Sequence, residues 1–411
     1  MISAHGLAAL LSIPLKTLVL IVLYPFVGGI GRKFSKDFIN SVKLVIFIGG
    51  ISMPIPDGKY LNVFSNKFLI RVLINYLHKK TVKTLPGYGE RYDEQSFWLV
   101  KQPDRKPSDP ILVYLHGGGY FLETMPSQVQ SVLAIQKLVD PKKREKLSIL
   151  LLDYKLCSSG YQFPYQRHQL HSTYQKLTKS EHNTNINFIG DSAGGNLAVI
   201  YLQLLKGLKD PETIFPKNII LISPWVKIVP DSSQYQPGQS YYDNDGRDMI
   251  NYYIFSREYP ENPILGKTDP NALEVSPGNC IASKPSDWDG ISTLRNSSSN
   301  VFVIVGEDEV FRDDVLNWTT EALDVPLGKQ KYGDSNNVFD AKKHSYIRKG
   351  NDKSAGVQVF VEPWGVHDSV FFFENDLLGK LEKNPSWTLK DINRDRYFGI
   401  TRIVEFLNDA L

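Results

Sequence analysis

A serine between small residues is the position in this chain best suited to do chemistry. Gly190-Asp191-Ser192-Ala193-Gly194 follows the apolar run 185–189 and precedes the helix-like run 195–202. A strand that passes into a helix through so sharp a turn holds its serine in strained backbone geometry, and only Gly or Ala beside it avoids a collision. The pattern therefore predicts a nucleophile elbow with Ser192 at its tip.

A second glycine-rich motif lies upstream, where His116-Gly117-Gly118-Gly119-Tyr120 ends the apolar run 111–115. Consecutive glycines leave backbone N–H groups free to point into a cavity, as an oxyanion hole for a tetrahedral ester intermediate requires. Either motif alone also occurs in ordinary glycine-rich turns. Both motifs in this order, each after a β-like run, predict a serine hydrolase whose oxyanion hole uses the N–H groups of Gly117, Gly118 and Ala193.

A serine hydroxyl needs a histidine base, which is itself oriented by a carboxylate. On a parallel sheet with a nucleophile elbow, the acid and the histidine follow the serine in that order. Of the eight histidines, only His344 and His367 lie far enough downstream. His344 sits among lysines and an arginine, where we expect a solvated side chain. His367 follows the strand-like run 357–363, so we expect it on a loop at a strand end and predict that it is the base.

The carboxylate should lie just past the preceding strand-like run, 301–305, where the chain reads Gly306-Glu307-Asp308-Glu309. Asp308 and Glu309 are both candidates, because either could reach an imidazole from a loop at that strand end. Acids one residue apart point in different directions, so only one of them can serve. The chemistry of the residues leaves this choice open.

The elements that must position these residues alternate between strand-like and helical patterns. This alternation predicts an α/β fold with a mostly parallel sheet, helices on both faces, and ligands at the carboxyl ends of the strands. Both glycine motifs fall at such ends. We expect strands at residues 97–100, 111–115, 148–152, 186–189, 218–222, 301–305 and 357–361, and helices at residues 127–139, 166–178, 195–208 and 312–323.

Length and composition favour one large catalytic domain with insertions, because no linker divides the 411-residue chain after about residue 96. We predict a catalytic domain over residues 57–411, with a cap insertion at about 225–300 and a mobile polar loop at about 328–356. The cap is rich in aromatic residues. We expect Trp225, together with Tyr120 beside the upstream motif, to bind substrate, the alternative being that such aromatics fill the cap's own core.

Charge and cysteine content narrow the function classes. A net charge of +3, with basic residues scattered along the chain, argues against nucleic-acid binding. Cys157 and Cys280 have no metal-ligand spacing, and the predicted chemistry needs neither a metal ion nor an organic cofactor. Asn296 and Asn317 begin N-glycosylation sequons, but a chain this rich in Asn, Ser and Thr contains such tripeptides by chance.

The N-terminal segment, residues 1–56, differs from the remainder of the chain. Residues 17–31 carry no charge, and adding residues 7–15 gives an apolar stretch of membrane-spanning size with Lys16 inside it. A lysine there can snorkel toward the surface. We predict that this segment associates with a membrane; the alternative is a buried helix of a cap over the active site. The basic residues Arg32, Lys33 and Lys36 after the span would place the enzyme in the cytosol.

The joint order of the motifs resembles the hormone-sensitive-lipase family of α/β hydrolases, from about residue 111 to the end. Within that family, the apolar N-terminus, the aromatic cap and the acid motif resemble the fungal steryl acetyl hydrolases, membrane-associated enzymes that deacetylate sterol acetates in the endoplasmic reticulum. The matching pieces are His116-Gly117-Gly118-Gly119, Asp153-Tyr154-Lys155-Leu156, Phe163-Pro164, Gly190-Asp191-Ser192-Ala193-Gly194-Gly195-Asn196, Ser223-Pro224-Trp225, Glu309-Val310-Phe311-Arg312-Asp313-Asp314 and His367.

The resemblance implies an α/β-hydrolase fold and a serine esterase that acts on a sterol acetate, or more broadly on lipid or arylacetamide-type esters. It implies a lumenal catalytic domain at the endoplasmic reticulum membrane, against the charge argument. Alignment of Arg312-Asp313 with the family's D-P-L-R-D motif places Glu309, and not Asp308, on the acid position. A non-catalytic ligand-binding protein of the same fold is the alternative from another class.

Overall fold

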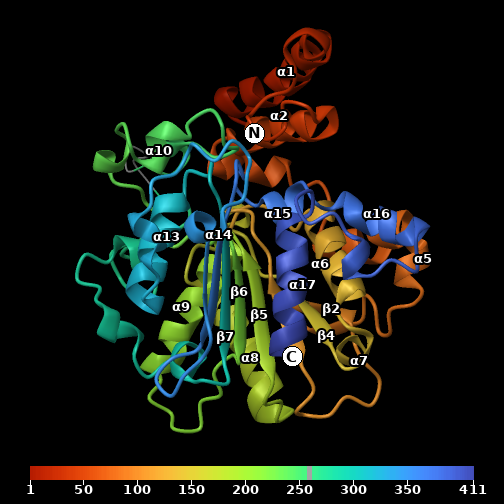
Figure 1. The fold of residues 1–411 in the computed structure, drawn as a ribbon, viewed down its shortest axis with the longest axis vertical. Helices are drawn as coiled ribbons and strands as arrows, with labels where there is room; N and C mark the ends of the chain where they lie inside the picture. Colours follow the sequence, from red (N-terminus) through yellow and green to blue (C-terminus); the bar gives the residue numbers. More distant parts are fainter. Residues whose placement is uncertain (257–261) are drawn as a thin grey trace.

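The computed structural model describes residues 1–256 and 262–411. In these residues, nine strands form one sheet in the order β1-β2-β4-β3-β5-β6-β7-β9-β8 (Figure 1). The strands from β4 to β9 in this order pair in parallel, whereas β1, β2 and β8 pair antiparallel at the two edges. Helices cover both faces, which makes this the α/β-hydrolase fold that the sequence predicted. The strands are β1 Arg91–Asp93, β2 Ser96–Val100, β3 Ile111–Leu115, β4 Ser148–Leu152, β5 Ile186–Asp191, β6 Asn218–Ile222, β7 Asn300–Gly306, β8 Ser345–Arg348 and β9 Gly356–Glu362.

Side chains of each central strand alternate between two hydrophobic cores, one on each face of the sheet. In β3, Val113 and Leu115 pack with α8, α9 and α13, whereas Leu112 and Tyr114 pack with α6, α16 and α17. Burial on both faces explains why these strands are continuous apolar runs in the sequence. The covering helices are α6 Pro126–Leu138, α8 Tyr165–Gln175, α9 Ala193–Gly207, α13 Arg312–Leu323, α16 Asp376–Lys383 and α17 Phe398–Ala410.

All seven predicted strands are present within two residues of their expected bounds, and so are the four predicted helices, of which the second continues as the π-helical segment Lys176–Ser180. Shorter helices occupy the connections. They are α3 Asn66–Phe68, α4 Asn75–Leu77, α5 Lys79–Val82, α7 Pro141–Arg144, α10 Ser240–Asp243, α11 Tyr252–Phe255, α12 Ser292–Arg295, α14 Ala341–His344 and α15 Ser369–Phe372.

The prediction of a mobile loop over residues 328–356 is wrong for its second half. There β8 pairs antiparallel with β9 at the edge of the sheet, directly after α14. An edge strand has a neighbour on one side only and keeps polar residues, so its sequence lacks the apolar run that marks a central strand. The solvated side chain expected for His344 is likewise wrong, because His344 is buried and its Nδ1 accepts the N–H of Asp340 (2.9 Å).

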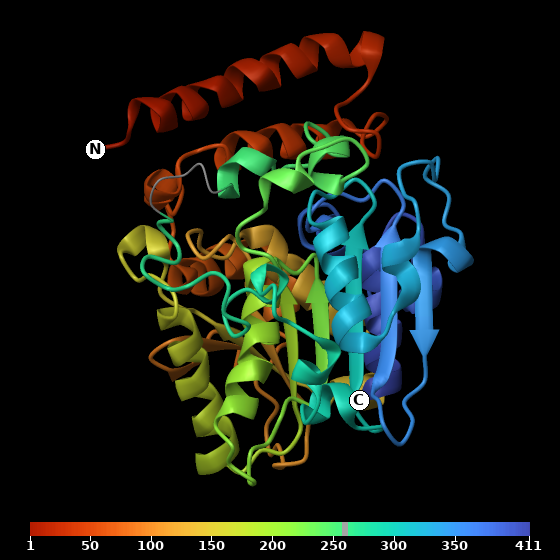
Figure 2. The same ribbon diagram turned by 90° about the vertical axis from the view of Figure 1, so that its left-hand side faces the viewer.

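Two apolar helices form the N-terminal segment, α1 Ala4–Val27 and α2 Phe38–Ile51. Figure 2 shows α1 lying outermost, with α2 between it and the rest of the molecule. In α1 only Gly6 and Leu20 are buried, although the helix is long and apolar enough by length and composition to cross a membrane. Helix α2, in contrast, packs on the catalytic domain, where the Phe47 ring lies 4.7 Å from that of Phe372.

Candidate active site

The predicted nucleophile stands on a strained turn between β5 and α9. Ser192 has φ 50° and ψ −115°, in a region that non-glycine residues rarely adopt. A Cβ atom at Gly190 would lie 2.5 Å from the carbonyl oxygen of Gly194, and one at Gly194 would lie 1.9 Å from that of Leu115. Both flanking positions therefore require glycine, which is the physical reason for the motif.

Three predicted residues meet at the carboxyl ends of the strands. His367 Nε2 lies 2.9 Å from Ser192 Oγ, and His367 Nδ1 lies 2.9 Å from Glu309 Oε1. Glu309 is fully buried, and its Oε2 accepts the hydroxyl of Ser223 (2.8 Å) and the N–H of Gly306 (2.9 Å). The carboxylate is therefore held in one orientation, and it in turn fixes the ring of His367.

Asp308 points away from this constellation. Its carboxylate forms a bidentate ion pair with Arg32, with Nε donating to Oδ2 at 2.9 Å and Nη2 donating to Oδ1. Arg32 lies in the turn between α1 and α2, and Lys33 beside it pairs with Glu362 at the end of β9. The structure thus brings Glu309, and not Asp308, to His367, and it uses Asp308 to attach the N-terminal helices.

Two buried carboxylates near His367 were missed by the sequence analysis. Asp368 Oδ2 lies 3.3 Å from His367 Nε2, and Asp368 Oδ1 has no hydrogen-bond partner in the described part of the chain. Asp248 accepts the N–H of His367 through Oδ1 and that of Val310 through Oδ2, each at 2.9 Å. The His-Asp dipeptide was a visible signal for Asp368, but nothing in the sequence marks Asp248.

These carboxylates shape the proton affinity of the site. Burial alone lowers the pKa of His367, but the charges of Asp368 and Glu309 outweigh it and raise that pKa to about 10. Burial raises the pKa of Asp248 to about 7. Among the described residues, no group of three His, Cys, Asp or Glu side chains is placed to hold a metal ion, and both cysteines are free.

In the glycine motif, one of the predicted oxyanion-hole donors is already engaged by the protein. Gly117 N–H donates to Asp191 Oδ1 (2.9 Å), so it is not free for an oxyanion, and the prediction for Gly117 is wrong. Gly118 and Gly119 line the cavity beside Ser192, with φ of 108° and 61°. Within residues 1–256 and 262–411, neither of their N–H groups has a hydrogen-bond acceptor. Ala193 begins α9, where an N–H has no intrahelical partner.

The cavity at Ser192 is small, about 40 Å³, and mostly apolar. Trp225 lines it, and the indole Nε1 of Trp225 is buried without an acceptor in the described residues. Tyr120 does not line it, because its hydroxyl donates to Asn196 Oδ1 (2.6 Å) and its ring is fully buried; that prediction is wrong. The other apolar lining residues are Phe47, Ile51, Phe121, Leu122, Met125, Met249, Ile250, Phe255, Phe311 and Phe372.

Phe47 and Ile51 belong to α2, so the N-terminal segment supplies part of the active-site wall. A division of the chain at residue 56 therefore cuts through the site. The cap side of the wall comes from Met249, Ile250 and Phe255, which follow β6 by about thirty residues. No local motif marks either set, because their position depends on packing between segments far apart in the sequence.

Comparison with known proteins shows related enzymes. The steryl acetyl hydrolase family profile matches residues 79–365. The Schizosaccharomyces pombe protein mug81, whose name assigns it to the steryl acetyl hydrolases, is 31% identical over 426 residues, 100% of this chain and 99% of that one. Steryl acetyl hydrolase 1 of Saccharomyces cerevisiae is 30% identical over 161 residues, 38% of this chain and 36% of that one. A crystal structure of an esterase from the bacterial hormone-sensitive-lipase family is 20% identical, covers 90% of this chain and 98% of its own, and has a TM-score of 0.49.

Proposed function

Because the chain belongs to the steryl acetyl hydrolase family and is thus a carboxylic-ester hydrolase, we propose that it is a serine esterase that deacetylates sterol acetates. The observation that carries the proposal is the connected set Ser192, His367 and Glu309, with both links at 2.9 Å. A ligand-binding protein without catalysis has no need of a histidine held between a serine hydroxyl and a buried carboxylate.

In the acylation half, Ser192 Oγ attacks the acetyl carbonyl carbon while His367 Nε2 takes the hydroxyl proton. Glu309 holds the ring of His367 and stabilises the imidazolium that forms. The oxyanion accepts hydrogen bonds from the N–H groups of Gly118, Gly119 and Ala193. When the intermediate collapses, the bond between the carbonyl carbon and the alcohol oxygen breaks, and His367 gives its proton to the departing alcohol.

In the deacylation half, a water molecule takes the place of the alcohol. His367 Nε2 removes one proton from the water as its oxygen attacks the acetyl carbonyl carbon. The second intermediate collapses with cleavage of the bond to Ser192 Oγ, and the proton on His367 returns to that oxygen. Acetic acid leaves and gives up its remaining proton to the solvent, and the serine and the histidine regain their starting protonation.

The size and lining of the cavity support a short acyl group on an apolar alcohol. About 40 Å³ at Ser192 suits an acetyl group better than a long acyl chain. The lining is almost entirely apolar, so a hydrophobic substrate is favoured. The free indole N–H of Trp225 is a donor that a bound ester oxygen can use, and we include Trp225 among the substrate-binding residues.

We also propose that residues 1–56 bind the endoplasmic reticulum membrane and that residues 57–411, catalytic domain and cap, lie on the lumenal side. Support comes from α1, whose outer face exposes Leu11, Leu15, Val22 and Phe26 to between 57% and 82%. Replacing Leu15 and Val22 with lysine should release the full-length protein from phospholipid vesicles in a flotation assay. Retention of the double variant on the vesicles would contradict the proposal.

The substrate is tested by offering the purified enzyme sterol acetates beside short-chain and long-chain glycerol esters. We expect the highest kcat/KM on the sterol acetate, and a fall of about 10⁶-fold in turnover of every ester by the Ser192→Ala protein. Comparable rates on many unrelated acetates would instead indicate a broad carboxylesterase. Efficient hydrolysis of long-chain glycerides alone would overturn the proposal.

A further inference from the structure

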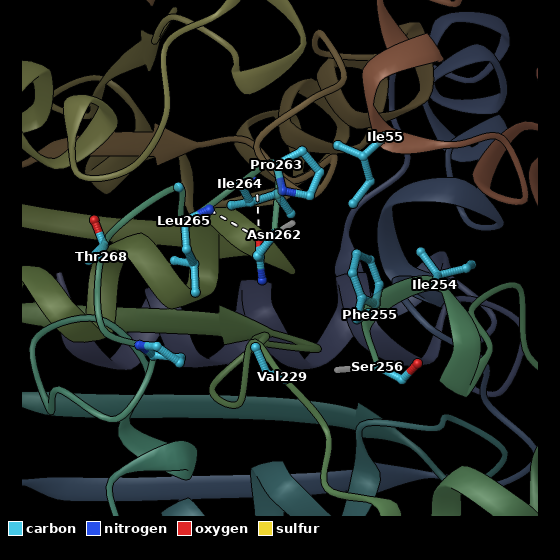
Figure 3. A pocket seen from close by; sticks show the side chains of 12 residues that line it. Ile55, Val229, Ile254, Phe255, Ser256, Asn262, Pro263, Ile264, Leu265 and Thr268 are labelled. Atoms are coloured by element: carbon cyan, nitrogen blue, oxygen red, sulfur yellow. Dashed lines mark hydrogen bonds between the residues drawn. The ribbon is translucent and has the colours of Figure 1, made fainter. Parts of the chain in front are cut away.

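A second, larger cavity adjoins the one at Ser192. Its volume is about 300 Å³, and Figure 3 shows side chains from separate segments arranged around it. Ile55 comes from the segment that follows α2, Val229 from the connection after β6, and Ile264 and Leu265 from the later part of the cap. Phe255 lines both cavities, so its ring forms part of the wall between them.

The position of Phe255 links this wall to the reacting residues. Its ring packs on Trp225, with the ring centres 4.4 Å apart, and lies 6.3 Å from Phe311. The Phe311 ring in turn meets the edge of His367 at 5.0 Å. Phe255 thus belongs to one aromatic cluster beside His367, at the boundary between the two cavities.

Polar groups around the larger cavity are mostly engaged by the protein itself. Asn262 Oδ1 accepts the N–H groups of Ile264 (3.0 Å) and Leu265 (3.1 Å), and the Thr268 hydroxyl donates to the carbonyl of Phe163 (3.0 Å). Ser256 is buried, and within the described residues its hydroxyl has no partner. The lining therefore combines a larger apolar part with polar surface that includes the Ser256 hydroxyl, which suits a mostly apolar molecule that carries a few polar atoms.

Other cavities fit such a molecule less well. A space of about 120 Å³ shares Leu122 and Met125 with the catalytic cavity, but it is smaller and Glu123 is among its lining residues. The groove between α1 and α2, about 440 Å³, shares no lining residue with the catalytic cavity. Among these three, the cavity behind Phe255 alone shares a lining residue with the catalytic cavity and also has a volume at the lower end of small-molecule sites, roughly 300–1,000 Å³.

We propose that this cavity binds the ring system of a bulky apolar alcohol while the acetyl group occupies the small cavity at Ser192, and that Phe255 sets which alcohols are accepted. The inference rests on the proposed esterase function and places the alcohol half of the substrate in the larger cavity. The cavity at Ser192 is too small for that half, and the adjoining cavity beyond Phe255 has the larger volume.

The proposal is tested by placing a larger side chain at the edge of the cavity. Ile254 lines the cavity and is partly exposed, whereas its neighbour Tyr253 is 53% exposed and does not line it. We expect Ile254→Trp to lower kcat/KM on a sterol acetate about tenfold or more and to leave 4-nitrophenyl acetate nearly unchanged. Tyr253→Trp is the matched control and should change neither. Ile254→Phe is a milder variant for use if the tryptophan variant unfolds early.

Two results would overturn the cavity proposal. One is an unchanged rate on the sterol acetate in a folded Ile254→Trp or Ile254→Phe protein. The other is an equal loss on both substrates, which would indicate general damage to the site. If the wild-type enzyme does not hydrolyse sterol acetates, the proposed substrate fails separately. The same variants are then compared on 2-naphthyl acetate, where equal rates for Ile254→Trp and wild type would overturn the cavity proposal itself.

Discussion

The floor and the cover of the active site are built in different ways. The floor consists of Ser192, Glu309 and His367, each within five residues of the end of a parallel strand. The cover consists of α2 and the cap residues near Phe255, which come from distant parts of the chain. Sheet register fixes the floor, whereas packing between helices sets the cover. The comparison suggests that the floor determines the reaction and the cover determines which esters reach it.

The N-terminal segment contacts the catalytic residues' own loop at Asp308, which is adjacent to the acid Glu309. Asp308 pairs with Arg32 of the N-terminal segment, while the adjacent Glu309 holds His367. The guanidinium of Arg32 also lies over the ring of Trp364, 5.6 Å from its centre. Because the two contacts come from adjacent residues, neighbouring substitutions can separate catalysis from the attachment of the N-terminal segment.

The largest effect is expected at the nucleophile. Ser192→Ala removes the attacking oxygen but leaves the buried backbone unchanged, so turnover of any acetate should fall by about 10⁶-fold. The thermal unfolding midpoint should stay close to that of the wild type. Steady-state kinetics on a chromogenic acetate measures the first effect and calorimetry the second; a variant as active as wild type would contradict the floor's role.

Substitutions of the adjacent acids Glu309 and Asp308 should separate an effect on catalysis from an effect on stability. Glu309→Gln removes the carboxylate that orients His367 through Nδ1 and should reduce kcat by about 10³- to 10⁴-fold. Asp308→Asn loses only the ion pair with Arg32, so it should lower the free energy of unfolding by about 1–3 kcal/mol with little change in kcat. Denaturant unfolding and kinetics on both proteins check this pair. The opposite ranking of kcat, in folded proteins, would move the acid role to Asp308.

The pH dependence of kcat/KM should show the effect of the Asp368 carboxylate on His367. His367 works as a base only when neutral, and the charge of Asp368 favours its protonated form, so kcat/KM should rise with pH along a limb above the ordinary imidazole range. Asp368→Asn removes that charge, while Glu309 and Asp248 still face His367. The limb should then move to lower pH. A limb that stays in place or moves upward would show that Asp368 does not act on His367.

The smallest effect is expected in the cover. Phe47→Ala opens the wall of the catalytic cavity without touching the reacting atoms, so kcat/KM on bulky esters should change by roughly threefold to tenfold, with 4-nitrophenyl acetate little affected. Ile46→Ala is the matched control, because Ile46 lies on the same helix, is 45% exposed and does not line the cavity. Equal behaviour of the two variants would remove α2 from substrate selection.

The same contrast explains what the sequence could predict. Ser192 and His367 were identifiable because each follows a strand, and the carboxyl ends of neighbouring parallel strands lie at one edge of the sheet. The central strands were identifiable because burial on both faces makes them continuous apolar runs. β8 was missed because an edge strand needs no continuous apolar run. Helix α2 was expected to associate with a membrane, but Phe47 and Ile51 on this helix also form part of the active-site wall.

A distant residue decides one choice that the residues alone left open and two predictions that were wrong. The choice between Asp308 and Glu309 depends on Arg32, which lies 276 positions away from Asp308. Gly117 has the flexibility expected of an oxyanion donor, but Asp191 takes its N–H. Tyr120 adjoins the motif, yet Asn196 engages its hydroxyl. In each case the local pattern named the right segment, and a hydrogen bond from elsewhere determined the role of the individual residue.

The central claim, that the floor carries the chemistry and Ser192 is its nucleophile, is tested most directly by covalent labelling. Wild type and Phe47→Ala are treated with a fluorophosphonate probe, and the modified peptide is identified by mass spectrometry beside Ser192→Ala. We expect one adduct on Ser192 in the first two proteins and none in the third. An unlabelled Ser192 in the folded wild type, or labelling that persists in Ser192→Ala, would contradict it.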